Sequence, residues 1–119
     1  MSMSQDSLQK LMIEMEDQLS NNQKDLNVTK SNLGHLIQQN KVLNLQISEI
    51  KRSKVDSVWQ SSGKAFLKIN TDNYLKKLQD DMDENKEMIK SLKKKQEYLE
   101  TSIEKTYEHI NRFITPPPR

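Results

Sequence analysis

Apolar residues recur at alternating steps of four and three along two long stretches of the chain, residues 8–50 and 75–113. Ten of thirteen stepped positions are apolar in the first stretch and nine of twelve in the second. A mean step of 3.5 residues is the coiled-coil period, which predicts two long helices with a narrow apolar seam. A helix lying on a globular core would instead carry a wider stripe of period 3.6, which drifts off such a seam over six heptads.

Between the two stretches, residues 58–69 (VWQSSGKAFLKI) alternate apolar and polar side chains. Alternation is typical of β-strands, and Ser62-Gly63 predicts a two-residue hairpin turn in which Gly63 supplies the positive φ. One face of this hairpin would then carry Val58, Ala65, Leu67 and Ile69. On the other face, Trp59 would pair with Phe66.

If the chain folds back at this turn, the residue numbers of any two facing positions add to 125. That register pairs Leu26 with Leu99 and Met15 with Ile110. In two places this register also makes polar residues of the two seams face each other: Asn40 faces Asn85, and Thr29 faces Gln96. Hydrogen bonds within these pairs would be lost in a slipped or parallel pairing, so they would favour the antiparallel register. Two further layers are not matched, Asn22 opposite Ile103 and Leu19 opposite Thr106.

The predicted fold class is therefore mainly α, a long antiparallel two-helix coiled coil joined by a single β-hairpin. We expect one domain with a helix at 5–53, a hairpin at 57–69, a helix at 71–114 and a Pro-rich tail at 115–119. An isolated two-stranded hairpin is marginally stable in water, so we expect another chain to cover it. The alternative is a hairpin folded down over the helix ends.

Charge is balanced along both helices. Residues 1–52 hold six basic and six acidic side chains, and residues 71–119 hold ten of each. Such a surface is typical of a solvated coiled coil and argues against nucleic-acid binding, which needs a basic face. The run Lys93-Lys94-Lys95 points in several directions on a helix and fits a solvated face.

The sequence offers little for catalysis, metal binding or membrane insertion. His35 and His109 are the only histidines, and the predicted register places them far apart, so we expect no enzyme activity, no metal and no cofactor. The carboxylates of residues 80–84 fit a solvated helix face. No apolar run exceeds three residues, which predicts no membrane span and no secretory signal. There are no cysteines, which fits a reducing compartment, and we expect a cytoplasmic location.

Two motifs carry a family resemblance that covers roughly residues 57–113. The hairpin VWQSSGKAFL and the later helical segment LKKKQEYLETSIEKTYEHI resemble prefoldin, specifically a β-type subunit of the eukaryotic kind. The resemblance implies a hetero-hexamer of two α-type and four β-type subunits, in which each β-type chain gives one hairpin to a double β-barrel platform. It thus implies an assembly role for Val58, Trp59, Gly63, Ala65, Phe66, Leu67 and Ile69.

The same resemblance implies a co-chaperone whose coiled-coil tips hold unfolded actin and tubulin and deliver them to the cytosolic chaperonin without ATP. Near the two termini, the apolar content exceeds what the seam uses, because Leu11 and Ile13 lie off the heptad positions. Methionine also gathers there, and its flexible side chain adapts to irregular apolar surfaces. We therefore expect client contacts at Leu8, Leu11, Met12, Ile13, Met15, Ile110, Phe113 and Ile114.

Two alternatives stay open at this point. The apolar residues near the termini also fit a frayed helix end with ordinary exposed side chains. The whole chain also fits a purely structural coiled-coil subunit of a tethering or scaffold complex, with no client of its own.

Overall fold

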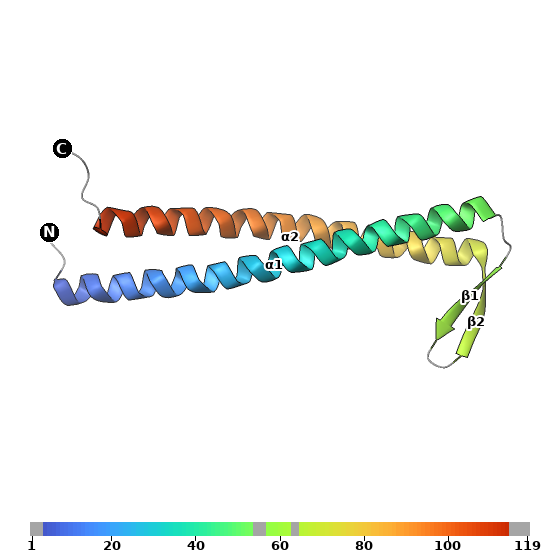
Figure 1. Ribbon diagram of the computed structural model, residues 1–119, viewed down its shortest axis with the longest axis horizontal. Coiled ribbons are helices and arrows are strands. Elements are labelled where there is room, and N and C mark those ends of the chain that lie inside the picture. The colour runs from blue at the N-terminus through green and yellow to red at the C-terminus, as the bar shows by residue number, and fades with distance from the viewer. Residues whose placement is uncertain (1–3, 54–56, 63–64, 115–119) are drawn as a thin grey trace. The chain divides into compact units, whose positions relative to one another are not determined.

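The computed structural model of the 119-residue chain describes residues 4–53, 57–62 and 65–114. Helix α1 (Gln5–Ser53) is followed by strands β1 (Ser57–Ser62) and β2 (Ala65–Asn70) and then by helix α2 (Thr71–Ile114) (Figure 1). Backbone packing divides the chain into two compact units, which are described separately below. The terminal unit comprises Met1–Asn32 and Leu92–Arg119, and the hairpin unit comprises Leu33–Ser91.

Both helices begin at a polar residue that satisfies the first backbone N–H groups. Ser4 Oγ accepts a hydrogen bond from the backbone N–H of Ser7 at 3.1 Å, three residues along, which is the usual geometry of an N-cap. Asn70 Oδ1 accepts from the backbone N–H groups of Asp72 at 2.9 Å and Asn73 at 3.4 Å. Asn70 thus ends β2 and caps α2 at the same position.

The core of the hairpin unit is a cluster of seam residues from both helices. Ile47, Leu78 and Met82 are buried, and Leu43, Ile50, Tyr74 and Leu75 pack against them. The pairs 47 with 78, 43 with 82 and 50 with 75 each add to 125, so the helices run antiparallel in the predicted register. Full burial of one such side chain contributes about 1.5–3 kcal/mol, which makes this cluster the main source of stability in the unit.

A hydrogen bond between two asparagines fixes the register of this unit independently of the apolar pattern. Asn85 Nδ2 donates to Asn40 Oδ1 at 3.0 Å, and Asn40 Nδ2 donates to the backbone carbonyl of Met82 at 3.3 Å. Both side chains are partly buried. The predicted pairing of Asn40 with Asn85 is confirmed.

The terminal unit has a separate core of the same kind. Leu26, Leu99 and Ile103 are buried together, and Leu19 packs against them. Thr106 is also buried, at 8% exposure, and its hydroxyl donates to the backbone carbonyl of Ser102 at 2.8 Å. The mismatch expected at Thr106 is therefore resolved within α2, because the helix backbone supplies the acceptor.

The second predicted polar layer does not form a hydrogen bond. Thr29 is the most buried side chain described, at 1% exposure, whereas Gln96 Nε2 donates to Glu100 Oε1 at 3.0 Å on its own helix. A glutamine is long enough to reach a carboxylate one turn further along, and the short Thr29 side chain does not compete with that charged acceptor. The expected contribution of this layer to register specificity is therefore wrong.

The two strands of the β-hairpin are antiparallel, and Ser62 lies opposite Ala65. The predicted turn at Ser62-Gly63 is wrong, because Ser62 belongs to β1. In the observed register Trp59 lies opposite Lys68 and Phe66 opposite Ser61, so the predicted direct pairing of Trp59 with Phe66 is wrong.

Candidate functional site

Five of the eight predicted client-contact residues lie in the first three turns of α1, within the terminal unit. Ile13 is 52% exposed. The other four, which lie on or beside the seam, are half-buried: Leu8, Leu11, Met12 and Met15. This segment of α1 therefore offers apolar surface that the unit's own packing leaves partly open.

The remaining three predicted contact residues lie in the last turns of α2, and the structure treats them differently. Ile110 is buried, at 9% exposure, and contributes to the packing of the terminal unit. Phe113 is 44% exposed. The side chain of Ile114 lies outside the described part, as do Met1, Met3 and the proline run at 116–118.

A shallow hollow lies beside Met15 in the terminal unit. Its volume is about 260 Å³, and it is lined by Met15, Gln18, Ser102, Lys105, Thr106 and His109. Met15 is the one predicted contact residue in this lining. The volume of this hollow lies below the roughly 300–1,000 Å³ that is typical of small-molecule pockets.

Six of the seven predicted assembly residues lie on β1 and β2, whose backbone pairing is described. Val58 lies opposite Ile69, Gln60 opposite Leu67, and Ser62 opposite Ala65. Gly63 lies outside the described residues. The two strands form a two-stranded sheet with one neighbour each, so each strand has one edge that this sheet leaves unpaired.

The structure also exposes large apolar side chains that the sequence reasoning did not single out. In the hairpin unit these are Val42 at 43%, Leu45 at 69% and Met88 at 48% exposure. In the terminal unit they are Val28 at 58%, Tyr98 at 70% and Tyr107 at 46% exposure. All six lie off the heptad seam, so the off-seam criterion that identified Leu11 and Ile13 would have found them.

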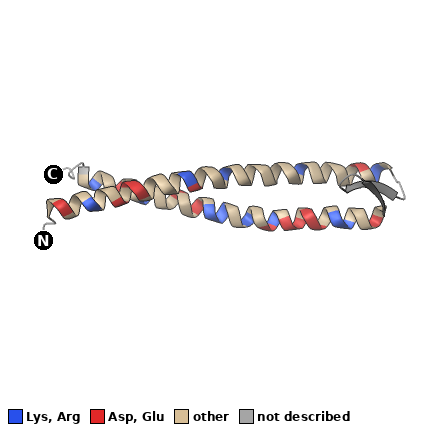
Figure 2. Cartoon of the chain, turned by 90° about the horizontal axis from the view of Figure 1, so that it is seen from below, with Lys and Arg blue, Asp and Glu red and all other residues tan. Residues whose placement is uncertain are grey.

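The two helices of the hairpin unit differ in how many charged residues they carry. Between Leu33 and Ser48, Lys41 is the only charged residue of α1, whereas ten of the twenty-one residues from Thr71 to Ser91 in α2 are charged. Figure 2 shows the contrast, with α1 mostly tan there and α2 red and blue along its length. A run of sixteen residues with a single charge is a sequence signal that a count over whole helices averages away.

Side-chain clusters for metal binding are absent from the described residues. No group of three or more histidine, cysteine, aspartate or glutamate side chains there is placed to hold a metal ion. His35 belongs to the hairpin unit and His109 to the terminal unit, and both are exposed. Within residues 4–53 and 71–114, neither helix has an apolar stretch that would let it cross a membrane.

These features define a coiled-coil protein of two antiparallel helices with a β-hairpin between them. A family of prefoldin subunits, Prefoldin_2, matches residues 13–115. The chain therefore belongs to the prefoldin subunit family, as its hairpin motif predicted. Members of this family are non-enzymatic chaperone subunits that assemble with other prefoldin subunits, so the chain is a chaperone subunit and not an enzyme.

Two known proteins are similar to the chain over most of its length. Prefoldin subunit 1 of Saccharomyces cerevisiae is 32% identical over 101 residues, which cover 85% of this chain and 93% of the yeast protein. The crystal structure of the prefoldin beta subunit from Thermococcus strain KS-1 matches with a TM-score of 0.79 at 17% identity, covering 90% of this chain and 95% of that one. The second likeness confirms the predicted fold class.

Proposed function

We propose that this chain is a β-type subunit of a hetero-hexameric prefoldin, with two α-type and four β-type subunits, that holds unfolded client chains and passes them to the cytosolic chaperonin without ATP. Clients of the actin and tubulin class are proposed from the family resemblance. The observation that carries the proposal is the open apolar surface of the terminal unit, where Ile13 and Phe113 are about half exposed on a chain of this family.

Physical chemistry supports holding at this surface. Unfolded chains expose apolar side chains, and their burial against Ile13 and Phe113 removes apolar area from water. Each contact is small, so a single chain would hold a client weakly. Several such surfaces in one complex bind with avidity while each contact still releases quickly, which a hand-off requires.

A triple variant tests the client surface. Changing Leu11, Ile13 and Phe113 to Ser in the assembled complex should reduce suppression of the aggregation of unfolded actin at least severalfold, because apolar area is lost without a change in charge. Native mass spectrometry should show the complex intact. The matched control is Val28→Ser with Tyr98→Ser, which removes exposed apolar side chains elsewhere in the same unit. Undiminished suppression by the triple variant would rule out this surface.

The hairpin is proposed as the assembly surface, since an unpaired strand edge favours pairing with strands of other subunits. Leu67→Asp should prevent incorporation of the chain into the hexamer, because a carboxylate is costly to bury in a barrel interior. Lys68→Asp places the same carboxylate at the next position, which is already polar, and should leave incorporation intact. A normal six-subunit mass for Leu67→Asp would refute the barrel assignment.

A further inference from the structure

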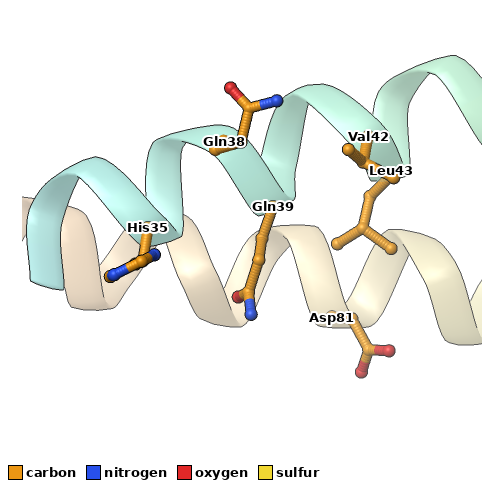
Figure 3. A pocket seen from close by; sticks show the side chains of 6 residues that line it. All are labelled: His35, Gln38, Gln39, Val42, Leu43 and Asp81. Carbon is orange, nitrogen blue, oxygen red and sulfur yellow. The ribbon is translucent and has the colours of Figure 1, made fainter.

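A hollow on the hairpin unit has features of a binding site, and it shares only Leu43 with the seam and no residue with the predicted assembly surface. Its volume is about 550 Å³, within the range of roughly 300–1,000 Å³ that is typical of ligand sites. Five of its lining residues come from α1 and one from α2: His35, Gln38, Gln39, Val42, Leu43 and Asp81. In Figure 3, His35, Gln39 and Leu43 extend from α1 toward α2, whereas Gln38 points away from α2.

The lining combines apolar surface with an amide group that other protein groups leave available. Val42 is 43% exposed, and Leu43 is half-buried. In the part of the chain that the structure describes, the side-chain amide of Gln39 makes no hydrogen bond with another protein group. This amide offers two donors and an acceptor, so it could pair with the backbone N–H and C=O groups of a bound chain.

The charges around the hollow indicate which kind of peptide it would bind. The α1 side of the hollow belongs to the nearly charge-free run between Leu33 and Ser48, so a bound segment loses no solvated ion pair there. Asp81 is the one acidic side chain in the lining, and it is half-buried. A partner with a basic side chain beside an apolar one would satisfy both the carboxylate and the apolar floor.

We propose that this hollow is a second client site, which binds an extended peptide segment carrying an apolar residue next to Lys or Arg. This inference rests on the proposed client-holding function. An extended chain fits better than a helix, because a helix has already paired its own backbone groups and would offer none of them to the amide of Gln39. The site would select basic-apolar segments, whereas the apolar surface of the terminal unit has no acidic residue among its proposed contacts.

Site-specific photo-crosslinking in the assembled complex tests the proposal. The chain has no cysteine, so Gln38→Cys gives one attachment point for a benzophenone before assembly with the other subunits. The probes are two unstructured peptides that differ only in Lys or Glu beside a leucine. The control is the same label at Glu87→Cys, an exposed position on α2 of the same unit.

We expect saturable adducts of the Lys peptide at Gln38→Cys and only background yield at Glu87→Cys. Adding Asp81→Lys should lower the Lys-peptide yield about fivefold and raise that of the Glu peptide, because the attraction between Asp81 and the peptide lysine becomes a repulsion. Equal yields from the two label positions, no effect of Asp81→Lys, or adducts formed only with another subunit would each overturn the proposal.

The same labelled complex separates this inference from the proposed function. With Leu11, Ile13 and Phe113 changed to Ser, the peptide adduct at Gln38→Cys should persist, because the hollow shares none of its lining with those residues. Loss of actin holding in that variant with no adduct at the hollow would leave the proposed function intact and refute the second site. Full actin holding with a retained adduct would support the hollow and refute the client role of the terminal surface.

Discussion

Asn85 donates its side-chain N–H to the side-chain oxygen of Asn40 at 3.0 Å, across an otherwise apolar seam. Asn40 in turn donates to the backbone carbonyl of Met82 at 3.3 Å. Asn40 is thus both acceptor and donor to α2, and these bonds are available only in one alignment of the helices. An antiparallel pair held by Leu and Ile alone has several apolar alignments of similar energy, so this layer adds specificity that burial lacks.

Asn40→Leu should lower the free energy of unfolding by about 1–2 kcal/mol, because the partly buried amide of Asn85 loses its acceptor. Asn44→Leu, at an exposed position one turn away, is the control and should change it little. Urea denaturation followed by circular dichroism measures both. Adding Asn85→Leu to Asn40→Leu should restore stability, since both polar groups are then gone.

Register itself should loosen in Asn40→Leu. Because the chain has no cysteine, paired cysteines report the alignment directly: Leu43→Cys with Met82→Cys for the observed register, and Leu43→Cys with Leu75→Cys for a slip of one heptad. We expect the slipped crosslink to appear only in the Asn40→Leu background. A single unchanged register in that background would show that the asparagine layer does not specify alignment.

The sequence predicted the features that depend on facing positions, and it missed those that depend on local geometry. Heptad breaks sufficed to pair Asn40 with Asn85, since seam position determines which residues meet. Facing positions could not reveal that Gln96 bonds Glu100 on its own helix, or that Thr106 bonds the carbonyl of Ser102. These local bonds form within one turn, where side-chain length and rotamer decide the partner.

Part of the candidate site was also predictable from the positions of residues on or off the seam. The exposure of Ile13 and Phe113 agrees with the excess of apolar residues near the termini, while Ile110 lies in the seam and is buried. The hollow at Val42 has no motif, since it arises from the spacing of side chains on two facing helices. The nearly charge-free run of α1 is the sequence signal beside it, and a charge count over the whole helix did not reveal that run.

Thr71 is a place where substitution should stabilise the chain. Its side chain is buried, and its hydroxyl has no hydrogen-bond partner in the described structure. Thr71→Val keeps the shape and removes the unsatisfied hydroxyl, so the free energy of unfolding should rise by about 1 kcal/mol.

Thr106→Val is the matched control for Thr71→Val. Its hydroxyl is hydrogen-bonded to Ser102, whose carbonyl keeps its helical partner, so the expected change is below about 0.5 kcal/mol. Both variants are measured by thermal and urea denaturation. A loss of stability in Thr71→Val would mean that its hydroxyl has a partner in solution.

Asn70→Ala should weaken the start of α2. It removes the acceptor for the backbone N–H groups of Asp72 and Asn73, which corresponds to about 1 kcal/mol for an N-cap. Asn73→Ala leaves both hydrogen bonds in place and should be nearly neutral. Amide exchange of residues 71–74 is the direct readout, and equal protection in the two variants would contradict the capping role.

The separate cores of the two units predict that a cavity in one should loosen that unit first. Leu99 is 4% exposed in the cluster of the terminal unit, and Leu78 is 5% exposed in that of the hairpin unit. Leu99→Ala and Leu78→Ala should each cost about 2–4 kcal/mol, whereas Val28→Ala, at an exposed position, should cost less than about 0.5 kcal/mol.

Hydrogen exchange measured by mass spectrometry shows which unit is destabilised in each variant. No buried side chain belongs to both clusters, so local opening in Leu99→Ala should raise exchange in residues 4–32 and 92–114 before it raises exchange in residues 33–53. Leu78→Ala should give the opposite order. Uniform acceleration in both variants would mean that the continuous helices couple the two cores strongly enough for the chain to open only as a whole.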